Sequence, residues 1–174
     1  MPKSSHVLEA LSLIENDKAK ILGLTVGKHA NVQPGDYIPR ADAQSPPELT
    51  FAPLSPEKTY LATSVDIDAP FASFAFLSPI LHWVQPGLQA PTTTTTTTLQ
   101  SKAPVVASYA PPGPPPGSAP HRYIFLLYEQ PAGFEGWGGG KPVARSQRMR
   151  FAYDAWVREV QLGPVLAVNF FTSN

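Results

Sequence analysis

Proline is the residue that most constrains how this chain can fold. It occupies 21 of the 174 positions, against a usual share of about 5%. Because proline lacks a backbone N–H and fixes φ, it is largely excluded from helix interiors and central strands. Many of the prolines stand between short apolar runs, and hydrophobic residues still make up 43% of the chain. The pattern therefore favours a packed, mostly β fold, a sandwich or a barrel, with short strands joined by proline-rich turns.

Apolar periodicity predicts two helices among the strands. Apolar residues recur at helical spacing over residues 5–18, which predicts a short amphipathic helix whose apolar stripe packs on the domain, with partner binding as the alternative. A second helix is expected over residues 153–161, because Gly163 and Pro164 form a typical helix stop. The strands are expected at residues 21–26, 48–51, 60–65, 80–84, 105–109, 123–128 and 165–171.

The chain is expected to form a single domain over residues 1–174. Residues 1–20 would be a helical extension at its N-terminus. A run of seven threonines, Thr92 to Thr98, lies in a segment of about residues 89–104 that we interpret as a loop insertion. A homopolymer specifies no strand register, so the threonines are expected to be mobile and dispensable.

Composition excludes several classes of protein. Cysteine is absent, which removes disulfides, thiolate metal sites and cysteine nucleophiles. Thirteen basic and thirteen acidic residues give zero net charge, so no basic field exists for a nucleic acid. Four histidines occur without a metal-binding spacing, and neither a metal nor a cofactor is expected. No signal peptide and no apolar run of membrane-spanning length is visible, and a cytoplasmic location is expected.

Polar residues that could carry chemistry stand at the ends of three expected strands. Asp66 and Asp68 end one strand, and His82 lies within another. His121 opens a third strand, directly after the glycine- and proline-rich segment 113–117. Each also has a structural interpretation: the carboxylates could cap a turn or pair with an arginine, and His82 could be a hydrogen-bonded core residue. His121 could simply begin a solvated strand. Their common position at strand ends beside loops favours a binding site.

Four segments, SVDIDAP, ILHW, GPPPGSAPHRYIFLLYEQ and LGPVLAVNFF, together resemble the phosphatidylethanolamine-binding protein (PEBP) family, which is also known for Raf-kinase inhibitors and flowering regulators. The resemblance runs in order from about residue 21 to residue 171. It implies a PEBP-like β-sandwich with a large central antiparallel sheet, a short N-terminal helix and one helix before the last strand. It also implies a small pocket that binds phosphate-like anions. By motif position the pocket would be lined by Asp66, Pro70, His82, Pro112, Gly113, His121 and Tyr123.

The resemblance also implies two cis peptide bonds beside the pocket, at Ala69–Pro70 and at Ser78–Pro79. The second bond commonly precedes a residue other than proline in the family, where a cis bond costs about 2.5–4 kcal/mol. Proline at position 79 lowers that cost to about 0.5–1 kcal/mol. The alternative is that Pro79 is a trans proline that begins the next strand.

This chain departs from the family pattern at the rim of the expected pocket. Ile67 replaces the first proline of the usual Asp-Pro-Asp-Ala-Pro motif, and residues 71–80 are apolar where relatives are charged. A more apolar rim favours a hydrophobic small molecule. The amino-acid sequences of this region and of the C-terminal segment resemble those of fungal members. Some fungal members belong to natural-product pathways that couple maleic-anhydride monomers into maleidrides.

Three functions follow from the resemblance. The first is a ligand-binding protein with a pocket for a small molecule that carries a phosphate, carboxylate or anhydride, plausible in fungal secondary metabolism. The second is a maleidride-type dimerising cyclase, an acid/base enzyme in which Asp66, His82 or His121 removes a proton and pocket donors stabilise the enolate. The third is an inhibitor of a kinase or of a serine carboxypeptidase, which would act on that protein partner through its surface.

Overall fold

The computed structural model describes residues 4–91, 98–134, 136 and 140–174, and it is built around a five-stranded antiparallel sheet with the strand order β5-β4-β3-β6-β7. Two further strands, β1 and β2, form a small antiparallel sheet of their own. The elements are α1 (Ser5–Asn16), β1 (Gly23–Thr25), β2 (Glu48–Thr50), β3 (Tyr60–Asp66), β4 (Ile80–Gln89), β5 (Gln100–Ser101), β6 (His121–Glu129), α2 (Tyr153–Glu159) and β7 (Ala167–Ser173), with 3-10 turns at Lys18–Lys20, Arg40–Asp42 and Arg145–Gln147.

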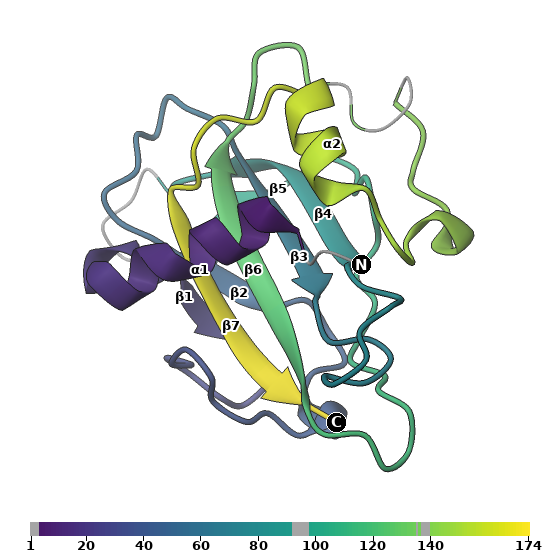
Figure 1. Ribbon diagram of the computed structural model, residues 1–174. Coiled ribbons are helices and arrows are strands. Elements are labelled where there is room, and N and C mark those ends of the chain that lie inside the picture. Colours follow the sequence, from purple (N-terminus) through teal and green to yellow (C-terminus); the bar gives the residue numbers. More distant parts are fainter. Residues whose placement is uncertain (1–3, 92–97, 135, 137–139) are drawn as a thin grey trace.

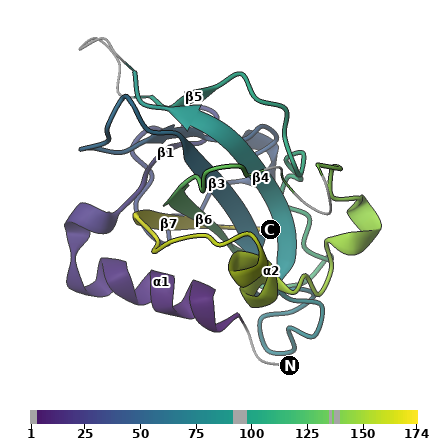
Figure 2. The same ribbon diagram turned by 90° about the horizontal axis from the view of Figure 1, so that it is seen from above.

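The large sheet is covered on both faces, as the expected β-sandwich requires. Both helices lie over one face, and the β1–β2 sheet lies over the other (Figures 1 and 2). The core on the helical face contains Val7 of α1 and Trp156 of α2, whereas the opposite core contains Leu24 of β1 and Leu49 of β2. Because β3 lies in the middle of the sheet with cover on both sides, all of its seven residues are buried.

A β-bulge in β4 decides where His82 points. Val65 of β3 faces Leu81, but the preceding residue, Ser64, faces Trp83, so β4 has one extra residue at this point. Leu81 and Val84 both pack in the core on the helical face, while Trp83 packs in the opposite core. A bulge of this kind re-aims a side chain at the end of a sheet. It places His82 on the same side as Trp83, near the start of β4.

Most of the expected elements are confirmed, with shifted ends, and one is wrong. The expected strand over residues 105–109 forms only an isolated bridge, between Val84 and Ala107, although the Ala110 amide also bonds to the His82 carbonyl oxygen at 2.8 Å. The sequence around it explains the failure, because Pro104 and the prolines that begin at position 111 remove donors that a continuous ladder needs.

Both expected cis peptide bonds are confirmed, at Ala69–Pro70 and Ser78–Pro79. A third, at Ala52–Pro53, was not expected. Of the threonine run, residues 92–97 lie outside the described residues, and Thr98 forms a bridge with Thr50. No helix in the described part of the chain is long and apolar enough to span a membrane.

Candidate functional site

A cavity of about 270 Å³ opens at one end of the large sheet, where β3 ends and β4 and β6 begin. Residues of the loops that follow β3 and precede β6 line its sides, and the two loops lie at the same end of the sheet (Figure 1). Six of the seven residues that the family resemblance implies line it, and Pro112 is the exception, since its neighbour Pro111 takes that place. The lining residues are Asp66, Ala69, Pro70, Leu77, Ile80, His82, Pro111, Gly113, Pro115, His121 and Tyr123.

The innermost polar group is a buried ion pair between Asp66 and His121. Nδ1 of His121 donates to Oδ2 of Asp66 at 2.8 Å, and Nε2 donates to the carbonyl oxygen of Pro70 at 3.1 Å. Because both partners can only accept, both ring nitrogens must carry a proton, and the imidazolium is the form that fits. Burial lowers the pKa of His121, but the hydrogen bond and the charge of Asp66 outweigh it, and the pKa is raised overall.

Asp68 has a structural partner rather than a place in the cavity. Its carboxylate accepts from Nε of Arg122 at 2.8 Å and from Nη2 at 2.7 Å, and it also accepts from the Arg122 backbone amide at 3.0 Å. The Asp68 amide in turn donates to Oδ1 of Asp66 at 2.7 Å. The interpretation that these acids pair with an arginine and cap a turn is therefore right for Asp68, and it holds in part for Asp66. Together the bonds fasten the loop after β3 to the start of β6.

His82 is held in the opposite protonation state from His121. Its Nδ1 donates to the carbonyl oxygen of Ala110 at 2.7 Å, which fixes the tautomer and leaves Nε2 as the proton acceptor of the ring. Burial lowers the pKa of His82, so the neutral ring is favoured. The ring packs edge-on against Tyr123, with centroids 5.1 Å apart. The hydrogen bonds and the opposite pKa shifts thus favour an imidazolium at His121 and a neutral imidazole at His82.

The Tyr123 hydroxyl is a buried polar group at the cavity. It makes no hydrogen bond of good geometry with any residue that the structure describes. Burial raises the pKa of Tyr123, and the nearby Gly113 amide and Arg40 charge offset only part of that rise. A buried polar group without a partner is costly, which makes this hydroxyl a natural contact for something bound in the cavity.

Two arginines near the cavity were not anticipated from the sequence. A Cβ at position 113 would lie 4.0 Å from Nη2 of Arg40, which places this exposed arginine at the rim. Arg148 is buried behind His82, where its guanidinium donates to the carbonyl oxygen of Ser108 at 2.6 Å and to the Ser108 hydroxyl at 3.1 Å. Its charge contributes to the lowered pKa of His82. Neither arginine adjoins a recognisable motif, so no local pattern could have identified it.

The cavity can therefore accept an anion or a proton, but it offers few ligands to a metal. Its titratable groups are two histidines, one carboxylate and one tyrosine. Within the described ranges, no group of three or more histidine, aspartate or glutamate side chains is arranged to hold a metal ion.

Comparisons with known proteins agree with this architecture. One similar protein, phomoidride biosynthesis cluster protein N of Talaromyces stipitatus, is 30% identical over 168 residues, which cover 86% of this chain and 82% of that protein. The carboxypeptidase Y inhibitor of Saccharomyces cerevisiae is 38% identical over 74 residues, which cover 36% of this chain and 30% of the inhibitor.

Solved structures show the same fold. The structure of a carboxypeptidase Y inhibitor complexed with its cognate proteinase superposes with a TM-score of 0.71 and 25% identity, covering 97% of this chain and 93% of that one. A phosphatidylethanolamine-binding protein from Plasmodium vivax superposes with a TM-score of 0.69 at 16% identity, covering 99% and 97% of the two chains. The profile of the phosphatidylethanolamine-binding proteins matches residues 28–167. The chain belongs to the phosphatidylethanolamine-binding protein family.

Proposed function

We propose that this protein binds a small molecule through an anionic group, a phosphate or a carboxylate, in the cavity at the end of β3. The arrangement of charge carries the proposal. The two acids beside the cavity are already paired, Asp66 with His121 and Asp68 with Arg122. By contrast, the structure gives neither Arg40 nor Arg148 a carboxylate partner among the described residues. The cavity therefore has an excess of positive charge, and an anion would compensate it.

The donors of the cavity support the same conclusion. The Tyr123 hydroxyl is buried without a hydrogen bond of good geometry, and the backbone at Gly113 lies beside it. Anionic oxygens form stronger hydrogen bonds than neutral ones. The walls that surround these donors are apolar, with Ile80 and Leu77 among them, and an apolar wall strengthens each electrostatic contact.

Calorimetric titration with inorganic phosphate and with methyl phosphate tests the proposal at low ionic strength. We expect Arg40→Gln to weaken binding about tenfold, because one charge at a partly solvated rim is worth on the order of 1.4 kcal/mol. Arg40 is exposed, so the variant should fold. Arg158→Gln is the matched control, since Arg158 is also exposed but lines a different cavity.

The salt dependence of binding gives a second measurement. Raising the ionic strength should weaken phosphate binding to the wild type more than to Arg40→Gln, because salt screens the rim charge. Failure of the wild type to bind either phosphate compound would contradict the proposal, as would equal affinities for Arg40→Gln and Arg158→Gln.

A second candidate function is acid/base catalysis in the same cavity, as a dimerising cyclase of maleic-anhydride monomers. The observation that favours it is the fixed tautomer of His82, whose Nε2 is left as a proton acceptor. In this mechanism Nε2 of His82 takes a proton from a carbon next to an anhydride carbonyl, and the Tyr123 hydroxyl donates to the oxygen of the enolate that forms. The similarity to the phomoidride cluster proteins is consistent with this chemistry.

Hydrogen–deuterium exchange tests the proton-abstraction step. A monomeric anhydride is incubated in D2O, and loss of its C–H signal is followed by NMR. We expect the wild type to accelerate exchange and His82→Gln to reduce that acceleration about 10²–10⁴-fold, the range typical of a general base. Far-ultraviolet circular dichroism would confirm that the variant is folded. Equal exchange rates for the wild type, His82→Gln and buffer would exclude the mechanism.

Inhibition of a kinase or a serine carboxypeptidase is the third candidate, and we do not favour it. The similarity to a carboxypeptidase Y inhibitor complexed with its proteinase supports it, but the described surface shows no feature that singles out such a partner. Titration of the protein against carboxypeptidase Y would decide the point, and we expect no inhibition at micromolar concentrations.

A further inference from the structure

Arg148 is a buried arginine without a counter-ion. Only 6% of its surface is exposed, and no carboxylate among the described residues pairs with it. Its Nε also lacks a hydrogen-bond partner among those residues. A buried charge without a carboxylate is costly, and an apolar side chain of similar volume would avoid that cost. The hydrogen bonds of its other two nitrogens therefore indicate what this charge contributes to the protein.

Those hydrogen bonds fasten the segment that the His82 ring contacts. Nη1 of Arg148 donates to the Ser108 carbonyl oxygen at 2.6 Å, and Nη2 donates to the Ser108 hydroxyl at 3.1 Å. Two residues further along, the Ala110 amide donates to the His82 carbonyl oxygen at 2.8 Å, and the Ala110 carbonyl oxygen accepts from Nδ1 of the His82 ring at 2.7 Å. Because a charged donor forms a strong hydrogen bond, Arg148 holds the stretch of backbone that supplies the ring with its partner.

The backbone between these contacts has no ladder to fix it. Backbone bonds with Val84 hold the segment at Ala107, and the next backbone bond is the one at Ala110. The Ser108 carbonyl group lies between these two points, and its partner is the Arg148 guanidinium. The position of the Ala110 carbonyl oxygen, and with it the bond to the His82 ring, therefore depends on Arg148.

The backbone of Arg148 is joined to the strand that carries His82. Its carbonyl oxygen accepts from the Leu81 amide at 2.9 Å, and Leu81 directly precedes His82 in β4. Arg148 thus contacts β4, which supplies the donor of the ring bond, and the segment at Ser108, which leads to its acceptor. A residue that spans both sides can fix their separation, as the supporting residues of a precise site must.

We infer that Arg148 is the positioning residue of His82: through Ser108 it sets the Ala110 carbonyl oxygen against Nδ1 of the ring and so fixes the tautomer in which Nε2 carries no proton. The inference deepens the proposed function and rests on it in one respect, because it takes His82 as a residue that a ligand in the cavity meets. With Nε2 unprotonated, a ligand group at this ring must donate a hydrogen bond or a proton.

The charges around the ring support the same state. Burial is the main reason why the pKa of His82 is lowered, and the charges of Arg148 and of His121 on β6 act in the same direction. The charge of Asp66 on β3 and the hydrogen bond of Nδ1 act against them. Tyr123, which packs edge-on against the imidazole, stays neutral because burial raises its pKa. A second proton on the His82 ring is therefore disfavoured.

NMR of the imidazole nitrogens tests the inference. With isotope-labelled histidine, long-range proton–nitrogen correlation spectra at pH 8 show which nitrogen of each ring carries the proton, and His82→Gln identifies the His82 signals. The test variant is Arg148→Lys, which keeps the charge but loses the planar fork that holds Ser108. Arg145→Lys is the matched control, because Arg145 lies only three residues away but is exposed.

For the wild type and for Arg145→Lys we expect the Nδ1–H tautomer of His82 to dominate. In Arg148→Lys the ratio of Nδ1–H to Nε2–H should fall about threefold to tenfold, the range that one hydrogen bond contributes, and the Nδ1 proton should exchange with water faster by a similar factor. Ser108→Ala removes only the longer of the two bonds and should change both quantities about twofold. It provides the answer if Arg148→Lys does not fold.

Urea unfolding and titration with methyl phosphate separate the possible failures. If Arg148→Lys loses stability while the tautomer ratio and the exchange rate stay as in the wild type, Arg148 only stabilises the fold and the inference is wrong. An equal change of the ring in Arg145→Lys would also overturn it. If the ring changes as expected but the wild type does not bind methyl phosphate, the proposed anion site is wrong and the positioning of His82 by Arg148 stands.

Discussion

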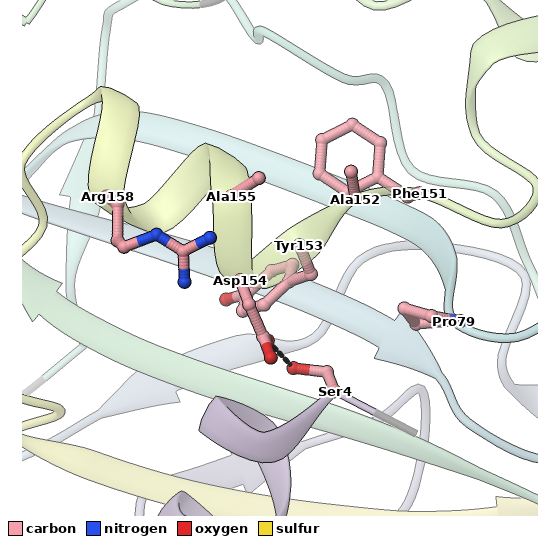
Figure 3. Close-up of a pocket in the computed structure, with 8 residues that line it drawn as sticks. All are labelled: Ser4, Pro79, Phe151, Ala152, Tyr153, Asp154, Ala155 and Arg158. Carbon is pink, nitrogen blue, oxygen red and sulfur yellow. Dashed lines mark hydrogen bonds between the residues drawn. The ribbon is translucent and has the colours of Figure 1, made fainter. Parts of the chain in front are cut away.

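Two cavities of nearly equal volume differ in whether their polar side chains already have hydrogen-bond partners. The cavity at the end of β3 measures about 270 Å³, and a second one between α1 and α2 measures about 260 Å³. In the second cavity Asp154 is engaged with the N-terminus of α1 (Figure 3). Its Oδ2 accepts from the Ser5 amide at 2.9 Å and from the Ser5 hydroxyl at 2.8 Å, and its Oδ1 accepts from the Ser4 hydroxyl.

The two cavities differ in the hydrogen bonding of their hydroxyl groups rather than in volume. Behind the second cavity the Tyr153 hydroxyl bonds to Thr63 at 2.6 Å and to Tyr128 at 2.9 Å, although Nε1 of the neighbouring Trp156 has no hydrogen-bond partner among the described residues. At the end of β3, by contrast, the Tyr123 hydroxyl has no partner among the described residues, and Nε2 of His82 is left as a proton acceptor. We therefore expect substitutions at the second cavity to change stability alone.

The largest expected effect is on the buried ion pair of the first cavity. Asp66→Ala should lower the free energy of unfolding by about 3–5 kcal/mol, because it leaves the buried His121 and the Asp68 amide without their partner. Urea unfolding at pH 7 measures it. Asp36→Ala, in an exposed turn, is the control and should cost much less. A loss below 1 kcal/mol for Asp66→Ala would show that the pair contributes little.

The buried hydroxyl network behind the second cavity should have the next largest effect. Tyr153→Phe removes the hydroxyl that joins Thr63 to Tyr128 and should cost about 1–3 kcal/mol, because the fully buried Thr63 hydroxyl loses its partner. Phosphate affinity, measured by calorimetry on the same variant, should stay unchanged, since Tyr153 packs on the opposite face of the sheet from the ligand. A change in phosphate affinity of more than twofold would contradict the expectation that the two regions act independently.

The hydrogen bonds from Ser4 and Ser5 to Asp154, which hold the start of α1, should contribute somewhat less to the free energy of unfolding. Asp154→Ala removes the acceptor for Ser4 and Ser5 and should lower the free energy of unfolding by about 1–2 kcal/mol, the usual range for a lost helix cap. Hydrogen exchange should show the loss of protection concentrated in α1. Uniform loss over the large sheet would mean that Asp154 stabilises the whole fold rather than this helix.

The smallest expected effect is a pair of opposite pH dependences of stability. Asp66 raises the pKa of His121 against the effect of burial, so this stabilisation is complete below about pH 6.5 and is lost as the pH rises through the raised pKa. Burial lowers the pKa of His6 on α1, against the charges of Asp154 and Glu9. Its contribution is therefore present above about pH 6.5 and is lost as the pH falls.

Two variants measure these slopes between pH 5 and pH 8. The stability difference between the wild type and Asp66→Asn should be largest at pH 5 and shrink towards pH 8. The difference between the wild type and His6→Phe should change in the other direction, because burial disfavours the charged form of His6. Slopes of the same sign would contradict the opposite pKa shifts of His121 and His6.

Much of the fold could be predicted from local sequence patterns, but prediction of the site also needed the family resemblance. The apolar spacing in residues 5–18 and 153–161 was enough to predict both helices, and the proline-bounded apolar runs predicted β3 and β6. The strand expected at 105–109 did not form because prolines on both sides of it interrupt a continuous ladder. For the cavity, the spacing of polar residues at strand ends suggested a site, and only the family resemblance placed Asp66, His82 and His121 together.

The amino-acid sequence by itself predicted the layered β architecture, and its resemblance to the family predicted the cis bonds at Pro70 and Pro79 and the residue types of the cavity. Tertiary structure alone decided the pKa shifts of the cavity residues and the directions in which their side chains point. The pKa of His121 is raised because Asp66, 55 positions away, lies at 2.8 Å, and His82 faces the cavity because β4 bulges against β3. Arg40 lies at the rim of the cavity and Arg148 behind His82, although the two come from unrelated segments. Periodicity is a local property of the chain, whereas charge balance and hydrogen-bond partners depend on which distant segments the packed core brings into contact.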